Sequence, residues 1–198
     1  MSGSATLLAT SWSIIIAYIL ASRRRVEIIS SIIEAMVGIP TVLLGLLLYM
    51  LFSHSGPLGF LNLLYTPQAM IIGESILITP LIISSTFRVL REAIQTYGEF
   101  AMSIGASRFQ TIHLILKETY PTLLAASVMG FSRAIGELGV AMMIGGNIKG
   151  YTRVMTTAIA LGVSKGEFET AIWLGLILLL IMIITSIVIK IIGRVARY

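Results

Sequence analysis

The chain has 198 residues, of which 57% are hydrophobic and only 12% are charged, whereas about 25% of the residues in an average soluble domain are charged. Its mean hydropathy of +0.96 therefore indicates an integral membrane protein. The net charge of +5 comes from basic residues at the ends of apolar runs, which is typical of membrane topology rather than of nucleic-acid binding. The sequence contains no cysteine, which excludes disulfides, thiolate metal sites and thiol catalysis.

Five apolar runs come close to or exceed the ~20 residues that one helical crossing of a bilayer needs. In chain order they are residues 5–22, 28–52, 69–90, 121–144 and 171–192. Each run is continuous rather than alternating, so we expect helices in all five. The predicted fold is all-α, a polytopic membrane helical bundle that occupies residues 1–198 as one domain. Pro40 and Pro80 fall inside the second and third runs, and we expect a kink at each.

Basic residues are divided unevenly between the two ends of these runs. One side carries only Lys149, Arg153 and Lys165, whereas the other carries Arg23, Arg24, Arg25, Arg88, Arg91, Arg108, Lys117, Lys190, Arg194 and Arg197. Because cytoplasmic loops are enriched in Lys and Arg, the richer side is predicted to be cytoplasmic. This orientation places Met1 outside the cell without a cleavable signal, so we expect that one N-terminal span is missing from the sequence.

Residues 88–120 interleave apolar and charged side chains, which predicts amphipathic helices on the cytoplasmic face rather than a crossing. Gly105 interrupts this segment, and Ser107 is followed at the third position by Gln110, the spacing of a capping box. We therefore predict a helix that ends at Gly105, a sharp turn, and a second helix that starts just after it. On these residues alone, either a solvated loop or a segment that binds a partner explains the pattern.

The fourth apolar run carries two ionisable residues, Arg133 and Glu137, four positions apart. Each charge costs about 2.5–3.5 kcal/mol at the centre of a membrane helix, and the spacing lets the two side chains pair on one helix face. A structural ion pair and a gate in a translocation pathway both explain them. Gly136 and two neighbouring glycines allow close helix packing. Glu74 in the third run is a second buried acid and a candidate partner of Arg133.

Motifs of several enzyme classes are absent from the sequence: a Walker sequence, a dinucleotide-binding glycine motif, a zinc-protease motif and a nucleophile elbow. His54 and His113 fall in predicted aqueous loops on opposite sides of the membrane, so they cannot share a metal ion. We therefore expect no metal site, no bound cofactor and no enzymatic activity in this chain alone.

The segment around Gly105 resembles the cytoplasmic EAA loop in the permease subunits of ABC importers. That pattern is Glu-Ala-Ala, three residues, Gly, and about ten residues later an Ile and a Leu-Pro. The residues that match are Glu99, Ala101, Gly105, Ala106 and Ile115. Phe100 replaces the first Ala, and Lys117-Glu118 stands where Leu-Pro is usual.

Three further segments resemble the permeases of oxyanion importers for molybdate, sulfate, phosphate and tungstate, and above all the tungstate permeases. They are GIPTVLLGLLLYMLFSHSGPLG, FSRAIGELG and GGNIKGYTRVMTTAIAL. The resemblance implies a type I ABC-importer permease, a multi-pass protein of the inner cell membrane. It also implies a second copy of the chain, cytoplasmic ATP-binding subunits that hold ATP and Mg²⁺, and an extracytoplasmic substrate-binding protein.

The resemblance also implies roles for individual residues. Those that would couple the chain to the ATPase, within the cytoplasmic coupling segment 88–120, are Glu99, Ala101, Gly105, Ala106 and Ser107. The residues in the translocation pathway or its gate would be Arg133, Gly136, Glu137 and Asn147. The residues that dock the binding protein would be Gly56, Pro57, Lys149 and Arg153. Two other functions stay open: an ion-coupled secondary transporter with Glu74, Arg133 and Glu137 as relay groups, and a membrane scaffold.

Overall fold

The computed structural model describes residues 1–23 and 26–195, and within these ranges it contains helices and no strands. The predicted all-α fold is therefore confirmed. In chain order the helices, with one 3-10 turn (η1) and one π turn (η2), are α1 (Ser2–Ala21), α2 (Glu27–Met36), α3 (Thr41–Phe52), η1 (Gly59–Leu61), α4 (Pro67–Ala93), η2 (Ile94–Gly98), α5 (Glu99–Ser103), α6 (Arg108–Ile135), α7 (Gly139–Gly145), α8 (Met155–Lys165) and α9 (Phe168–Val195).

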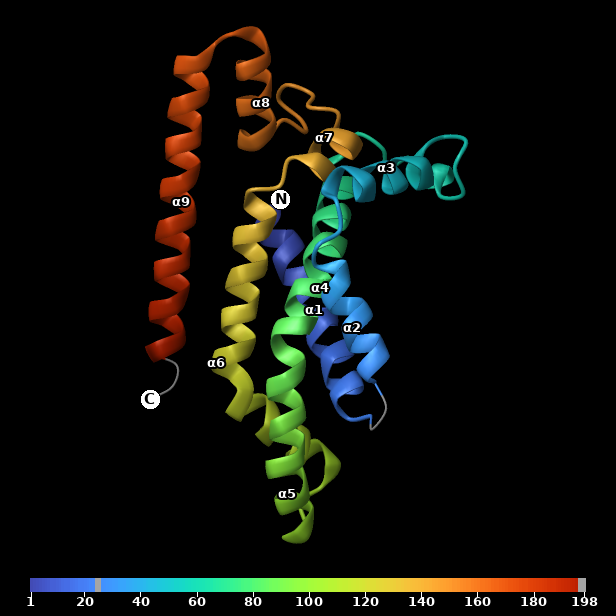
Figure 1. Ribbon diagram of the computed structural model, residues 1–198, viewed down its shortest axis with the longest axis vertical. Coiled ribbons are helices and arrows are strands. Elements are labelled where there is room, and N and C mark those ends of the chain that lie inside the picture. Colours follow the sequence, from blue (N-terminus) through green and yellow to red (C-terminus); the bar gives the residue numbers. More distant parts are fainter. Residues whose placement is uncertain (24–25, 196–198) are drawn as a thin grey trace.

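Three helical segments are long and apolar enough to cross a membrane alone, namely α1, α4 with its continuation to Gly98, and α9. They coincide with the first, third and fifth predicted spans, and two bent helix pairs raise the number of candidate spans to five. Pro80 lies inside α4 without ending it. Helix α4 occupies the centre of the bundle, with α1, α2 and α6 around it (Figure 1).

Neither the second nor the fourth apolar run is a single straight helix. The bend expected at Pro40 is confirmed, whereas an unbroken helix in the fourth run was expected wrongly. Helices α2 and α3 meet at 96°, and α6 and α7 meet at 59°. The first break ends at Pro40, whose backbone is extended (φ −60°, ψ 119°). The helix breaks here because proline lacks the N–H that would continue it and disfavours helical backbone in the preceding residue. The second break covers residues 136–138. Both breaks turn short helices away from the bundle axis at the same end of the molecule (Figure 1).

Helix α1 packs closely against α4 because it presents a small residue once per turn. The buried small residues on this face are Ala5, Ala9, Ser13, Ala17 and Ala21. Small residues allow membrane helices to approach closely, and hydrogen bonds across the contact reinforce it. Trp12 Nε1 donates to Thr79 Oγ1 over 2.6 Å, and Ser75 Oγ donates to the carbonyl oxygen of Ala5 over 3.1 Å.

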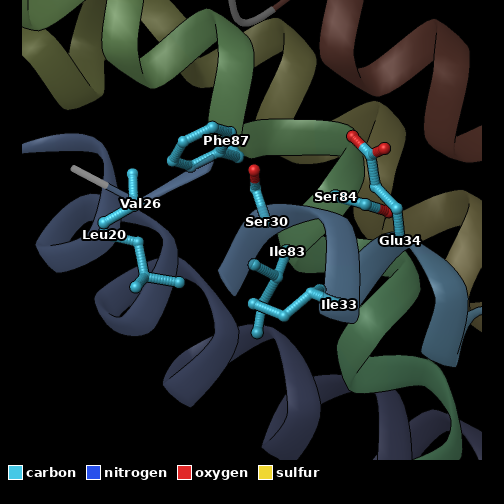
Figure 2. Close-up of a pocket in the computed structure, with 8 residues that line it drawn as sticks. All are labelled: Leu20, Val26, Ser30, Ile33, Glu34, Ile83, Ser84 and Phe87. Atoms are coloured by element: carbon cyan, nitrogen blue, oxygen red, sulfur yellow. The ribbon is translucent and has the colours of Figure 1, made fainter. Parts of the chain in front are cut away.

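Helix α2 is attached to α1 and α4 through a small apolar contact, shown in Figure 2. Ile33 of α2 points toward Ile83 of α4, and Phe87 lies above Ser30. An ion pair between Arg88 and Glu34, with an N–O distance of 3.4 Å, joins the same helices. Both partners are exposed, so this pair adds little to stability, and the apolar contact holds α2 in place.

Glycine brings α7 against the start of α3. A Cβ at Gly139 would lie 2.5 Å from Thr41 Oγ1 and 2.9 Å from the backbone nitrogen of Val42. A Cβ at Gly45 of α3 would lie 2.8 Å from the Cβ of Met143 in α7. Neither position accommodates a larger residue without moving a helix, so these glycines fix where the fourth run bends over the second.

The region between the fourth and fifth apolar runs contains helix α8. Gly166 (φ +77°) ends α8, and the chain then reverses into α9 (Figure 1). A Cβ at Gly162 of α8 would lie 3.4 Å from the Cβ of Ala171 in α9, so the two helices pack closely at these residues. Helix α9 leaves most of its apolar surface exposed, which suits contact with lipid or with another helix.

Candidate functional site

The predicted helix, turn and second helix of the coupling segment are confirmed, and backbone geometry at Gly105 makes the turn. Gly105 has φ +82°, and no atom lies within 4 Å of the position its Cβ would take. The amide of Ala106 closes the turn by donating to the carbonyl oxygen of Ala101 over 3.0 Å. Glycine is therefore required here for its backbone conformation and not for lack of space.

The predicted capping box is also confirmed. The amide of Gln110 donates to Ser107 Oγ over 3.3 Å, and the amide of Ser107 donates to Gln110 Oε1 over 2.8 Å. Ala101 is buried, Ala106 is half-buried and Ser107 is exposed. The backbone of Glu99 begins α5, but its side chain lies outside the described part of the structure, so its predicted role in coupling stays a prediction.

The coupling segment differs from the prediction in where its helices end. The third span does not stop before it, because α4 passes through the π turn η2 directly into α5. Likewise α6 runs unbroken from Arg108 through Pro121 to Ile135, although the fourth span was predicted to begin at Pro121. Both arms of the segment are thus extensions of the long helices that form the bundle.

Large apolar side chains are exposed at the tip of the coupling segment. Phe100, Ile104 and Phe109 are 60%, 68% and 80% exposed. The tip is the lowest part of the molecule in Figure 1, at α5, and lies beyond the ends of α1 and α9. A protein partner at this tip would bury apolar surface that is otherwise in contact with water.

The predicted pairing of Arg133 with Glu137 is confirmed, with 2.6 Å between Arg133 Nη1 and Glu137 Oε2. The two residues do not share one continuous helix, however. Helix α6 ends at Gly136, and the other carboxylate oxygen of Glu137 accepts from the amide of Val140, 3.0 Å away, at the start of α7. The carbonyl of Glu137 accepts from Thr156 Oγ1 of α8 over 2.9 Å. Glu137 therefore ties three helices together at the break.

Gly136 is not a close-packing position, because the only atom near its Cβ position is the carbonyl oxygen of Ser132, 3.7 Å away. Its role in the structure is to end α6. The neighbouring Gly130 does pack closely, since a Cβ there would lie 3.0 Å from Ile82 Cδ1. Close approach of α6 to α4 thus rests on Gly130, one turn and a half earlier.

Glu74 shares a cavity with Glu137 instead of pairing with Arg133. It is 2% exposed, and its Oε2 has no hydrogen-bond partner among the described residues. The cavity has a volume of about 520 Å³, and its lining includes Glu74, Glu137, Arg153 and Thr156. Sequence reasoning missed that Arg153 reaches this cavity, because a loop between two short helices gives no periodic signal of where its side chains point.

Arg153 and Asn147 form one unit. Arg153 Nε donates to Asn147 Oδ1 over 3.0 Å, and Nη2 donates to the Asn147 carbonyl over 3.2 Å. Asn147 has φ +52°, a left-handed conformation that asparagine tolerates better than most residues. Lys149, in contrast, is exposed in the same loop. The structure thus separates Lys149 at the surface from Arg153, which faces the cavity.

Gly56 and Pro57 lie in the tight loop after α3. A Cβ at Gly56 would lie within 3 Å of the carbonyl oxygens of Met50 and Leu51, so this glycine is required by the fold of the loop. Pro57 is exposed. This loop and the loop of Asn147 lie at the end of the molecule opposite to α5 (Figure 1). A partner bound to them would not contact the coupling segment.

In the described ranges, 1–23 and 26–195, no group of three or more His, Cys, Asp or Glu side chains could hold a metal ion. The ionisable side chains that line the large cavity are two carboxylates and one guanidinium, and Met1, which carries the chain's N-terminal amine, lines it as well. These groups can form ion pairs or exchange protons.

The family of binding-protein-dependent transport system inner membrane components matches residues 9–198. The chain belongs to this family. It is therefore a multi-pass inner-membrane protein of the kind that the EAA-like segment indicated.

Several members of the family are similar over most of their length. The tungstate uptake system permease protein TupB of Peptoclostridium acidaminophilum is 39% identical over 183 residues, which cover 91% of this chain and 80% of that protein. TupB of Campylobacter jejuni is 37% identical over 153 residues, or 77% of this chain and 64% of that protein. A probable anion ABC transporter permease protein of Haloferax volcanii is 34% identical over 162 residues, or 79% and 70%. The resemblance to oxyanion permeases is confirmed.

The ion pair at the helix break can be tested with a double-mutant cycle. Arg133→Met leaves the Glu137 carboxylate buried without its charged partner, which should lower the free energy of unfolding by about 1–3 kcal/mol. Adding Glu137→Gln removes the buried charge and should restore part of that loss. Unfolding of the purified protein in detergent measures both effects. Strictly additive losses would show that the two side chains do not stabilise the break together.

Proposed function

We propose that this chain is the membrane subunit of an ATP-driven ABC importer, which carries an oxyanion from an extracytoplasmic binding protein into the cytoplasm. Tungstate is the cargo we favour, because two relatives above 35% identity are named as tungstate uptake permeases. In this proposal ATP and Mg²⁺ are bound and used by separate cytoplasmic subunits, and this chain performs no hydrolysis itself.

The observation that carries the proposal is the continuity of the coupling segment with the bundle. Helix α4 leads into α5 without a loop, Gly105 reverses the chain, and α6 leaves the turn as a single 28-residue helix that ends beside Glu137. A force on the tip is transmitted along stiff helices rather than absorbed by a flexible linker. An ATPase that moves the tip would thereby move the break at residues 136–138.

The residues at that break suit a gate for an anion. Arg133 offers a guanidinium that Glu137, a residue of the cavity lining, neutralises in the present state. Arg153, which also lines the cavity, is held by Asn147. A passing oxyanion would compete with Glu137 for Arg133, since guanidinium binds carboxylates and tetrahedral oxyanions in the same bidentate way. Lys149, exposed in the outer loop, adds positive charge near the entrance.

The exposed faces suit the remaining partners. Helix α9 and the bent α3 present apolar surface away from the bundle, and a second copy of the chain would cover part of it to enclose a path. The outer loops with Gly56, Pro57 and Lys149 are placed to receive the binding protein. Each of these contacts is part of the proposal.

A second candidate function rests on Glu74. A buried carboxylate with an unpaired oxygen, beside Glu137 in one cavity, is also what an ion-coupled transporter would use as a relay. The two functions differ in their energy source, so they can be separated by experiment.

Reconstituted transport distinguishes them. The chain is placed in vesicles with its ATPase subunits and binding protein and supplied with tungstate enriched in one tungsten isotope, and accumulation of that isotope is measured by elemental mass spectrometry. We expect uptake that requires ATP, survives ionophores that collapse proton and sodium gradients, and is reduced by unlabelled tungstate more than by molybdate. Uptake that persists without ATP and stops with the ionophores would contradict the proposal and favour the relay.

The turn can be tested separately with two substitutions at Gly105. Valine is disfavoured in left-handed backbone by about 1–2 kcal/mol, whereas asparagine adopts it readily, and both side chains enter open space. Gly105→Val should therefore lower the ratio of native to non-native turn by about 5–30-fold, and ATP-driven uptake should fall with the population of the native turn. Gly105→Asn is the matched control and should retain more uptake. Equal uptake by the two variants at equal membrane levels would exclude a role for this turn in coupling.

A further inference from the structure

The cavity at the helix break, with a volume of about 520 Å³, is lined by one carboxyl group that is buried without a full set of partners. Glu74 is 2% exposed, and its Oε2 accepts no hydrogen bond from any described residue. That oxygen is also buried from solvent. An ionised oxygen that is neither hydrated nor hydrogen-bonded is costly in a protein interior, and a proton on the carboxyl group removes that cost.

The charged groups around Glu74 come from three other segments. Arg133 is paired with Glu137 at the helix break, and Arg153 donates to an asparagine of its own loop. Met1, which carries the N-terminal amine, also lines the cavity. None of these cations forms an ion pair with Glu74 in the described part of the chain. Helices α3 and α7, which pack against α4, carry no charged side chain, and α9 contributes only a leucine to the cavity.

Entry of an anion changes the charge balance of this cavity. In the proposed gate the oxyanion takes Arg133 from Glu137, so the cavity then holds the anion beside two carboxyl groups, and like charges away from bulk water repel strongly. Glu137 keeps the amide of Val140 as a hydrogen-bond donor, whereas Oε2 of Glu74 has no donor among the described residues. Glu74 is therefore the acid that gains most from a proton.

We propose that Glu74 carries a proton while an oxyanion occupies the cavity, so that a neutral carboxyl group lines the path in place of a carboxylate. The carboxylate takes the proton from solvent as the anion enters and returns it to solvent after the anion has left. A neutral carboxyl group does not repel the anion, and its O–H can donate to an oxyanion oxygen. This inference rests on the proposed function, and it differs from the relay of an ion-coupled transporter because ATP stays the only source of energy.

The first test compares Glu74→Gln with the wild type in the reconstituted importer. Glutamine has nearly the shape of the protonated acid, donates hydrogen bonds as that acid does, and has no proton to lose. The variant should therefore keep ATP-driven tungstate uptake across the pH range. Between about pH 6 and about pH 8, the ratio of wild-type to variant uptake should fall by up to about tenfold per pH unit, as for one required proton. Taking this ratio cancels the pH dependence of the ATPase and of the binding protein.

Glu169→Gln is the matched control, because Glu169 is exposed at the start of α9 and does not line the cavity. The ratio of wild-type uptake to uptake by this variant should not change with pH. Loss of uptake by Glu74→Gln at every pH, with the variant folded and inserted, would overturn the proposal, because the ionised form would then be the one required. If the wild type and Glu169→Gln also lack ATP-dependent uptake, it is the proposed function that fails.

Infrared spectroscopy detects the proton directly and does not depend on transport. The purified chain is measured with tungstate in a maltoside detergent, which has no carbonyl group to mask the C=O stretch of a protonated carboxyl group. We expect this band in the wild type and in Glu169→Gln, and its loss in Glu74→Gln. If the uptake ratio does not change with pH, a band that persists at the higher pH supports the proposal, since Glu74 then keeps its proton throughout. A constant ratio with no such band in the wild type would overturn it.

Discussion

The structure depends on one chain reversal in water that joins two helices of the bundle without a flexible link. Left-handed backbone at Gly105, the hydrogen bond from Ala106 to Ala101 and the reciprocal cap between Ser107 and Gln110 define that reversal. Each is a short-range interaction of modest strength, but together they fix how the arm that ends in α5 is placed relative to the arm that begins α6. Because the arms continue as α4 and α6, the arrangement of the tip and that of the membrane helices are set together.

The opposite end of α6 is built differently. There the helix stops inside the apolar part of the chain, and the break is held by charge: Glu137 bonds Arg133, the start of α7 and a threonine of α8. Buried charges are costly, and they persist where geometry satisfies them. Such a junction can rearrange when a competing anion arrives, whereas a purely apolar junction would have no response to it. The same helix therefore connects a stiff turn at one end to an ionic junction at the other.

Local sequence signals predicted the parts of the fold that local interactions determine. Spans one, three and five follow from apolar length, and the turn follows from Gly105 and the spacing of Ser107 and Gln110. The breaks in the second and fourth runs could not be predicted in the same way, because the residues on both sides of each break are as apolar as a membrane helix. Pro40 indicated a bend but not one of 96°, which depends on Gly139 and Gly45 letting α3 and α7 meet.

The candidate site shows the same division. The pairing of Arg133 with Glu137 follows from their spacing, whereas the cavity that brings Glu74, Glu137 and Arg153 together depends on contacts between segments far apart in the sequence. The sequence also did not show that Gly56 is required by the fold of its own loop, where a Cβ would meet the carbonyl oxygens of Met50 and Leu51; its predicted role in docking stays a prediction.

The central claim is that the tip at residues 99–107 lies in the cytoplasm against an ATPase. Because the sequence has no cysteine, a single cysteine can be labelled without background. Ile104→Cys replaces an exposed residue at the tip, and Ile148→Cys replaces an exposed residue in the loop at the opposite end. In oriented vesicles, Ile104→Cys should react with a membrane-impermeant maleimide only from the cytoplasmic side and should be protected by the ATPase subunits, and Ile148→Cys should react only from the outside. Reaction of Ile104→Cys from the outside, or unchanged labelling when the ATPase is bound, would contradict this account.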